Sequence, residues 1–170
     1  MENGHEIKVL DNGHAQYVRG HSGEIELRLK LPIFVKNQYS AIQANQENED
    51  QARFLKIPNE FYIPKLWRME GQVEGQEVPE SNLNHEFYSE EAEKFNDDAY
   101  DIYDNMVNAG IELEMAKMFL PLSIYVEVDF SWSAEEVLNF IKLKNSPLAS
   151  FEIKEYAKAV EKIYKELAFD

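Results

Sequence analysis

The sequence has no cysteine, and this absence excludes several kinds of site. Disulfides, thiolate-bound metals and cysteine nucleophiles are all ruled out in this chain of 170 residues. The absence is consistent with a cytoplasmic protein, which is the location we expect. No apolar run approaches the roughly 18 to 20 residues that cross a bilayer, and residues 1–14 lack the basic and apolar regions of a signal peptide. We therefore expect no membrane partner.

Basic side chains are scarce, and one part of the chain has almost none. The sequence contains 17 Lys and Arg against 32 Asp and Glu, which gives a net charge of −15. Residues 69–114 carry fourteen acidic side chains and a single lysine, Lys94. Nucleic-acid backbones are bound by clustered Lys and Arg, so we expect no nucleic-acid partner. The ordinary interpretation of the acidic stretch is a solvated surface that aids solubility.

Residue patterns typical of well-known catalytic and metal sites are missing as well. There is no glycine-rich phosphate loop, nucleophile elbow or catalytic triad pattern. The carboxylates Asp97, Asp98 and Asp101 fall where a helix would expose them, so we interpret them as a charged surface and not as ligands. The four histidines lack the spacing of a metal site. They are His5, His14, His21 and His85. We expect no bound metal.

What the sequence does contain favours one packed domain over residues 1–170. Its content of 44% hydrophobic and 12% aromatic residues supports a globular core. Apolar and polar residues alternate from Glu24 to Leu31, which predicts a half-buried strand. Similar patterns predict β structure over 5–31 and 123–130, helices over 33–43, 89–110, 111–119, 133–144 and from Ser146 onward, and loops over 44–51 and 69–88. We therefore expect an α+β fold, in which a small antiparallel sheet packs with several amphipathic helices.

The stretch from Pro32 to Trp67 is the part of the chain most typical of a binding site, because a polar centre lies between two apolar ends. It begins with P-I-F-V-x-x-Q, from Pro32 to Gln38, and its later part reads N-E-F-Y-I-P, from Asn59 to Pro64. Between these ends the sequence also contains the regularly placed polar residues Asn48, Glu49 and Arg53.

Two later elements complete a pattern that is similar to a known family. Residues Gly110 to Pro121 read G-x-x-x-E-x-A-K-x-x-L-P. The second element consists of Ser133, Glu135, Asn139, Phe140, Leu143, Lys144, Ala149, Ser150, Glu152 and Ile153. Together with the first stretch, these elements resemble the flavin-dependent thymidylate synthases in order and in spacing. Three ordered elements are much harder to obtain by chance than one motif.

The resemblance implies the family's fold and its reaction. That reaction is the reductive methylation of dUMP to dTMP, in which FAD carries hydride from NADPH and methylenetetrahydrofolate gives the carbon. It further implies a small-molecule nucleotide ligand and a homotetramer with sites between subunits. The residues that it places at the nucleotide are Gln38, Gln51, Arg53, Lys117 and Lys144, and those that it places at the flavin are Gln43, Glu49 and Asn139. It assigns no catalytic residue.

The chain departs from the family pattern mainly at charged positions. Ala41, Ile42 and Gln43 stand where the family has R-H-R, which removes positive charge where a flavin diphosphate needs it. Lysine replaces arginine at Lys117 and Lys144, and lysine cannot supply arginine's planar fork of donors. The other departures are Gln46, Gln51, Phe54 and Glu135.

These departures leave three functions open. The first is the family's own reaction, and the second is a catalytically inactive homologue, a pseudoenzyme, that binds a nucleotide or another ligand on the same scaffold. The third is an altered enzyme that uses a related pyrimidine nucleotide or another cofactor. Some retained residues also have purely structural interpretations. Glu49 and Arg53 would pair in a local helix, Glu152 would be an exposed helix residue, and Lys144 would favour the C-terminal end of its own helix.

Overall fold

The computed structural model describes residues 6–21, 23–42, 57–69 and 83–167. These residues fall into two compact units, and each is described by itself. The larger unit combines the chain up to Tyr62 with the part from Leu122 onward, and the smaller unit is Ile63–Pro121. A single domain over 1–170 therefore stays a prediction. In the described part, no helix combines the length and the apolar character that a membrane crossing requires.

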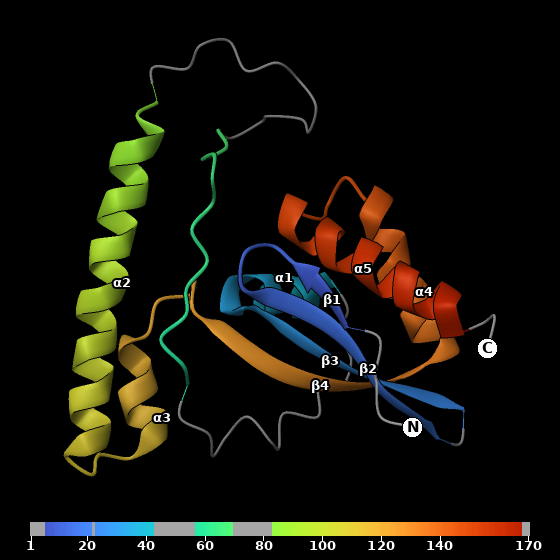
Figure 1. Ribbon diagram of the computed structural model, residues 1–170, viewed down its shortest axis with the longest axis horizontal. Coiled ribbons are helices and arrows are strands. Elements are labelled where there is room, and N and C mark those ends of the chain that lie inside the picture. Colours follow the sequence, from blue (N-terminus) through green and yellow to red (C-terminus); the bar gives the residue numbers. More distant parts are fainter. Residues whose placement is uncertain (1–5, 22, 43–56, 70–82, 168–170) are drawn as a thin grey trace. The chain divides into compact units, whose positions relative to one another are not determined.

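The larger unit contains a four-stranded antiparallel sheet with the strand order β1-β2-β3-β4 (Figure 1). The strands are β1 Glu6–Val9, β2 Gly13–His21, β3 Glu24–Pro32 and β4 Tyr125–Ser133. The first three follow one another in the part of the chain predicted to be β structure. β4 comes from far along the chain and extends past the predicted end at Phe130, because Ser133 still pairs with Glu24 at the start of β3.

Strand β3 has the two faces that its alternating sequence predicts. Leu27 and Leu29 are 1% exposed and Leu31 is 3% exposed. On the other face, Arg28 lies opposite Asp129 and donates two hydrogen bonds of 2.7 and 2.8 Å to its carboxylate. Burying a leucine contributes about 1.5–3 kcal/mol, whereas a partly exposed ion pair contributes about 1 kcal/mol or less. The apolar face therefore contributes most to holding β3 in the sheet.

Three α-helices and a short 3-10 helix accompany this sheet. They are α1 Ile33–Ile42, α4 Ala134–Lys142, η3 Leu143–Asn145 and α5 Phe151–Leu167. Helix α1 begins directly after β3, as predicted, while the predicted loop 44–51 lies outside the described residues. Helix α4 begins with a capping box, at the predicted helix start. The Ser133 hydroxyl accepts from the backbone N–H of Glu136, and the Glu136 carboxylate accepts from the N–H of Ser133.

Helix α5 begins later than the predicted start at Ser146. The hydroxyl of Ser146 accepts a hydrogen bond of 3.2 Å from the N–H of Leu148, which forms a turn instead of a helix. The hydroxyl of Ser150 then accepts from the N–H of Ile153, at 3.4 Å, at the start of the helix. The side chain that caps α5 is therefore Ser150, and the prediction chose the wrong serine.

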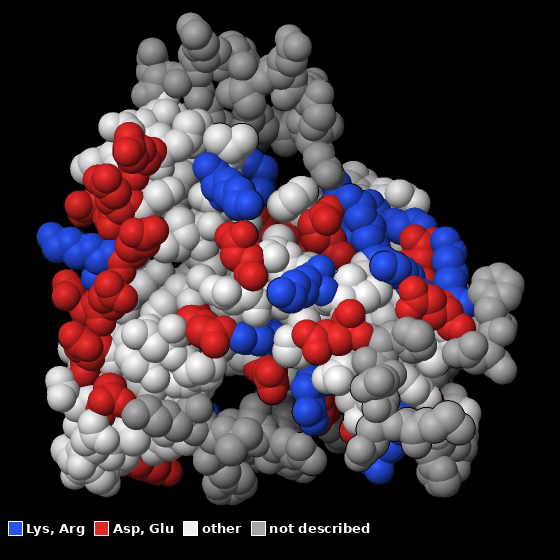
Figure 2. Space-filling model, in the orientation of Figure 1, with Lys and Arg blue, Asp and Glu red and all other residues white. Residues whose placement is uncertain are grey.

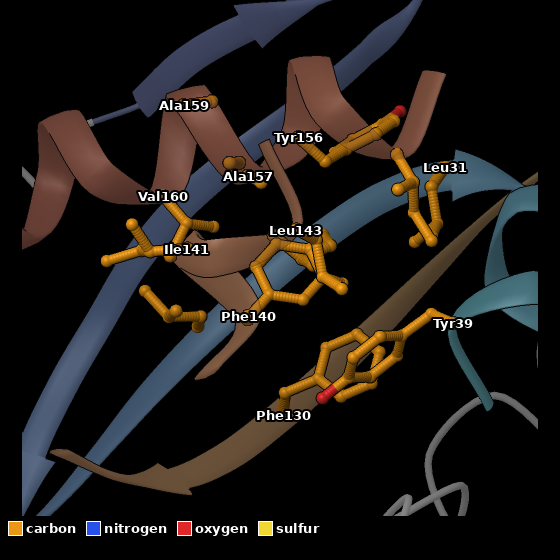
Figure 3. Packing of buried hydrophobic residues seen from close by; sticks show 14 of the residues in the cluster. Leu31, Tyr39, Phe130, Phe140, Ile141, Leu143, Tyr156, Ala157, Ala159 and Val160 are labelled. Carbon is orange, nitrogen blue, oxygen red and sulfur yellow. The ribbon is translucent and has the colours of Figure 1, made fainter. Parts of the chain in front are cut away.

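The core of the larger unit lies between the sheet and the helices (Figure 3). The ring of Tyr39 in α1 contacts those of Phe130, Trp132 and Phe140, with centroid distances of 6.0, 5.6 and 5.0 Å. Edge-on ring pairs of this kind contribute about 0.5–1.5 kcal/mol each beyond their buried area. Helix α5 adds fully buried side chains, namely Ile153, Tyr156, Ala157 and Val160. Helix α5 is thus amphipathic, as the sequence predicted for the helices of this fold.

Among its described residues, the smaller unit contains one long helix and two short ones, α2 His85–Asn108, α3 Leu113–Ala116 and η2 Lys117–Phe119. Helix α2 begins four positions before the predicted Ser89, because the side chain of Asn84 caps it by accepting from the N–H of Phe87. The loop predicted over 69–88 is therefore wrong for its last residues, and 70–82 lie outside the described part. Gly110, with φ of 79°, follows the end of α2 as predicted.

The extended segment before α2 is fastened to the start of that helix through Trp67. Its backbone N–H donates to Nδ1 of His85 at 3.1 Å, and its indole N–H donates to the hydroxyl of Ser89 at 3.1 Å. The Trp67 ring also lies 6.2 Å from the ring of Tyr88. Residues 63–69 and the first turns of α2 are therefore joined by polar and aromatic contacts.

Candidate functional site

The family-like segments of the larger unit meet at the start of α5. The hydroxyl of Tyr62, in the N-E-F-Y-I-P segment, donates a hydrogen bond of 3.0 Å to Oε1 of Glu152 in the first turn of α5. Tyr62 is 8% exposed and Glu152 is 1% exposed. The interpretation of Glu152 as an exposed helix residue is therefore wrong. Its side chain is buried, and it connects two motif segments.

A second hydrogen bond attaches α1 to the same place. The side-chain oxygen of Gln38 accepts from the backbone N–H of Ser150, immediately before α5, at a distance of 3.1 Å. The first N–H groups of a helix have no partner within the helix, so this contact fixes both the glutamine and the helix start. The amide nitrogen of Gln38 carries two further donors. Gln38, predicted to contact the nucleotide, thus also has a structural role.

Backbone contacts hold the segment that carries Tyr62. The N–H of Tyr62 donates to the carbonyl of Ser123, and the N–H of Tyr125 donates to the carbonyl of Glu60, both at 2.9 Å. The rings of Phe34 and Tyr62 lie 5.9 Å apart. We name the hydrogen-bonded set of Tyr62, Glu152, Gln38 and Ser150 the α5 frame. It joins the P-I-F-V-x-x-Q segment and the N-E-F-Y-I-P segment to the family-like element that contains Ser150 and Glu152.

Two buried tyrosines lie close to the α5 frame. Burial raises the pKa of Tyr125 to about 12, and burial, with added effects of Tyr125 and Tyr62, raises the pKa of Tyr156. Both hydroxyls therefore stay protonated at neutral pH and do not serve as bases. The Tyr156 hydroxyl donates to the carbonyl of Lys30 at 2.5 Å, and Lys30 in turn pairs with Glu60.

Lys144, which the resemblance places at the nucleotide, is already paired with a carboxylate. Nζ of Lys144, in η3, lies 2.6 Å from Oε1 of Glu161 in α5, and Lys165 lies 3.0 Å from the same carboxylate. These two ammonium groups hold the pKa of Glu161 below its ordinary value. Lys144 therefore contacts a second helix, which corrects the interpretation that it merely favours the end of its own helix.

The remaining predicted site residues are placed less favourably. The side-chain oxygen of Asn139 accepts from Nζ of Lys142 at 2.7 Å, on the exposed side of α4. Lys117 belongs to the smaller unit, where its Nζ donates to Glu114 at 2.8 Å. Four predicted residues lie outside the described part, namely Gln43, Glu49, Gln51 and Arg53. The structure thus brings Gln38 to the α5 frame, and it does not bring Lys144 or Asn139 into that set of hydrogen bonds.

The residues present do not suit a flavin diphosphate held in the family's way. Alanine, isoleucine and glutamine occupy the R-H-R positions, and none of them can offer the charged donors that a diphosphate requires. Within the described residues, no group of three or more His, Cys, Asp or Glu could hold a metal ion. Asp97, Asp98 and Asp101 are exposed on α2, where the sequence predicted a charged surface.

Sequence reasoning missed the burial of Glu152, although the helix contained a signal for it. Glu152 lies four residues before Tyr156 and three residues after Ala149, so helical spacing places it on the buried face. Its acidic side chain suggested exposure instead. A carboxyl group on the apolar face of a helix requires a polar partner, and Tyr62 is such a partner.

Comparisons with known proteins show which family this chain is similar to. The family model described as thymidylate synthase complementing protein matches residues 7–168. A flavin-dependent thymidylate synthase from Thermotoga neapolitana is 32% identical over 152 residues, covering 86% of this chain and 66% of the relative. One from Thermus thermophilus is 31% identical over 141 residues, covering 83% and 52%. The chain therefore spans about half to two thirds of these relatives.

A solved structure shares the fold. It is a crystal structure of a UMP/dUMP methylase from Streptomyces cacaoi bound with 5-Br UMP, and its TM-score is 0.69. The match covers 85% of this chain and 70% of the methylase, with 24% sequence identity. The predicted α+β architecture, with its small antiparallel sheet and several helices, is confirmed by this likeness.

Proposed function

The chain belongs to the flavin-dependent thymidylate synthase family, matched by the model for thymidylate synthase complementing proteins, and from this premise we propose that it binds a uridine monophosphate-type nucleotide, dUMP or UMP. The observation that carries the proposal is the α5 frame, in which Tyr62–Glu152 and Gln38–Ser150 hold three motif segments together. The methylase that shares the fold is described as bound with 5-Br UMP, which supports a uracil ligand.

Within this proposal, each candidate residue has a task that suits its chemistry. The amide nitrogen of Gln38 would donate to a uracil carbonyl, while its oxygen stays on Ser150. Arg53 would bind the phosphate through its planar fork. Gln51 would add a hydrogen bond to the nucleotide, and Lys144 would add positive charge once it is released from Glu161.

The full reaction of the named relatives is the second candidate. The observation in its favour is the family match over nearly the whole chain. It would require FAD, NADPH and methylenetetrahydrofolate, and assembly into a homotetramer as in the family. Against it stand the uncharged residues at the R-H-R positions and the pairing of Lys144 with Glu161. Binding without catalysis, a pseudoenzyme role, is therefore the function that the geometry supports best.

The absorbance of the purified protein separates these two functions. A nucleotide-binding scaffold should be colourless and should remain so after titration with FAD and gel filtration. The second candidate predicts a yellow protein that oxidises NADPH when dUMP and methylenetetrahydrofolate are added. Bound flavin with this turnover would establish catalysis and overturn the preference for binding alone.

Thermal unfolding in the presence of nucleotides tests the binding proposal itself. Added dUMP or UMP should raise the midpoint in proportion to the logarithm of its concentration, whereas AMP should not. Arg53→Ala should weaken the nucleotide by more than about 1 kcal/mol, roughly fivefold, which exceeds the effect of an ordinary surface charge. Arg19→Ala is the matched control, because Arg19 is an exposed arginine paired with Glu26. No shift with either uridine nucleotide at large excess would refute the proposal.

A further inference from the structure

Helix α2 exposes a row of large apolar side chains on one face. Tyr88, Phe95 and Ile102 are 46%, 62% and 46% exposed. They are seven residues apart, close to two full helical turns of 3.6 residues, so they lie above one another along the helix. We name these three residues the α2 stripe. Isolated exposed apolar residues are common, but three in one row form a contact surface.

The α2 stripe borders the face that α2 buries. Asn96, Ala99 and Tyr103 are the buried residues of α2. Tyr103 lies eight positions after Phe95, which rotates it by roughly 80° around the helix axis, whereas Ala99 lies four positions after Phe95 and only about 40° away. Helix α2 therefore carries an exposed apolar row beside its buried face.

Carboxylates stand between the apolar residues of the stripe. Glu91 lies three residues after Tyr88, and Asp98 lies three residues after Phe95, so both are neighbours of the stripe on the helix surface. Along its whole length α2 carries eight acidic side chains and one basic one, Lys94. Figure 2 shows acidic side chains gathered along this helix. The exposed apolar row is thus bordered by strong negative charge.

We propose that the α2 stripe binds a basic amphipathic helix of another protein. An apolar row on such a helix would cover Tyr88, Phe95 and Ile102, while its flanking Lys and Arg would pair with carboxylates such as Glu91 and Asp98. This is the helix-in-groove mode of recognition, with apolar anchors at helical spacing and charges that set the choice of partner. The inference does not depend on nucleotide binding.

A second copy of this chain matches the stripe less well. Two α2 helices in contact would bring sixteen carboxylates together against two lysines, eight and one from each helix, and like charges facing each other oppose association. The exposed lysines of α5 are a poor substitute. Lys158 is already paired with Glu155 and Lys165 with Glu161, and the remaining exposed lysine, Lys162, cannot by itself balance eight carboxylates. Charge complementarity therefore favours a different, basic partner.

Fluorescence anisotropy with synthetic peptides tests the proposal. The probe is a labelled peptide of leucine and lysine whose leucines follow helical spacing, and the comparison is a peptide of the same composition with scrambled order. The protein should bind the first peptide, and rising salt should weaken that binding. The scrambled peptide should bind at least about tenfold more weakly, because it lacks the apolar row. Equal binding of the two peptides would reduce the effect to general charge attraction and overturn the proposal.

Matched variants locate the contact on α2. Glu91→Gln with Asp98→Asn should weaken the amphipathic peptide severalfold, whereas Glu90→Gln with Asp97→Asn, equal in charge change but away from the stripe, should not. Phe95→Ser should weaken it as well, with circular dichroism confirming that the helix is retained. Equal losses in both acidic pairs would overturn the proposal. So would light scattering that shows an oligomer converted to a monomer by Phe95→Ser, because a second copy would then cover the stripe.

Discussion

The hydroxyl of Tyr62 donates a hydrogen bond to the carboxyl group of Glu152 across 90 residues of sequence, and both side chains are buried. A carboxyl group within a protein interior is strongly unfavourable unless polar partners satisfy it. The tyrosine provides such a partner, and its ring also contacts Phe34 at the start of α1. This pair therefore does two things: it makes the burial of Glu152 possible, and it fixes the N-E-F-Y-I-P segment against α5.

Removing this hydrogen bond should destabilise the fold measurably. We expect Tyr62→Phe to lower the free energy of unfolding by about 1–3 kcal/mol, because the buried carboxyl group loses a donor. Urea unfolding monitored by circular dichroism measures the change. Tyr88→Phe is the control, since Tyr88 is half exposed and the same hydroxyl deletion should cost little there. Equal effects of the two substitutions would contradict a special role for the Tyr62–Glu152 pair.

A second prediction concerns Gly13, at the start of β2. A Cβ atom at this position would lie 2.1 Å from the hydroxyl of Tyr156 and 2.7 and 2.8 Å from the carbonyl oxygens of Val9 and Lys30. Two of these atoms are backbone, so they cannot simply move away. We expect Gly13→Ala to destabilise the protein by at least about 1–3 kcal/mol, as overpacking generally does.

Gly20→Ala is the matched control for Gly13→Ala in the same strand. Its Cβ would come no closer than 3.3 Å, to the end of the flexible Tyr17 side chain. The effect there should stay within about 1 kcal/mol. Thermal unfolding of both variants makes the comparison, and a loss at Gly13 no larger than that at Gly20 would show that the Tyr156 contact does not constrain β2.

Much of the fold could be predicted because its signals are local. The alternation in β3 and the capping box of Ser133 and Glu136 each lie within a few residues, and the structure contains both. Element starts were less certain, because neighbouring residues compete to cap a helix. Ser150 caps α5 where Ser146 was predicted, and Asn84 starts α2 before Ser89.

The site was harder to predict, because its contacts join distant parts of the chain. The bond from Gln38 to Ser150 links residues 112 apart, and the ion pair from Lys144 to Glu161 links two helices. The family resemblance identified Gln38 and Lys144 as candidates, but it could not show that each already has a protein partner. Only the folded arrangement distinguishes a cation that is available to a ligand from one that is neutralised.

The capping box of α4 predicts a pH dependence. Hydrogen bonds from the Ser133 side chain and backbone hold the pKa of Glu136 below its ordinary value of 4.5. A lowered folded-state pKa means that this stabilisation is complete above the unfolded value and is lost as the pH falls through the folded one. The contribution should therefore fade below about pH 4.5.

Ser133→Ala tests this pH dependence. We expect it to lower the free energy of unfolding by about 0.5–2 kcal/mol at neutral pH, and to lower it less at acid pH, where Glu136 is protonated in both proteins. NMR titration of the Glu136 carboxyl group should show its pKa rising toward 4.5 in the variant. A loss of stability that is the same at both pH values would contradict the coupling between the serine and the glutamate.

The pairing of Lys144 with Glu161 leads to the last prediction, in which an anion site is strengthened by substitution. Because Glu161 neutralises Lys144 at 2.6 Å, Glu161→Gln should free the lysine for a nucleotide phosphate. We expect dUMP affinity to rise by up to about 1 kcal/mol, or up to roughly fivefold. Glu155→Gln is the matched control, since it removes the same charge from α5 but breaks the ion pair with Lys158 instead. Titration calorimetry should show the gain only for Glu161→Gln, and adding Lys144→Gln should abolish it. Equal gains in both single variants would indicate a general charge effect and remove Lys144 from the proposed site.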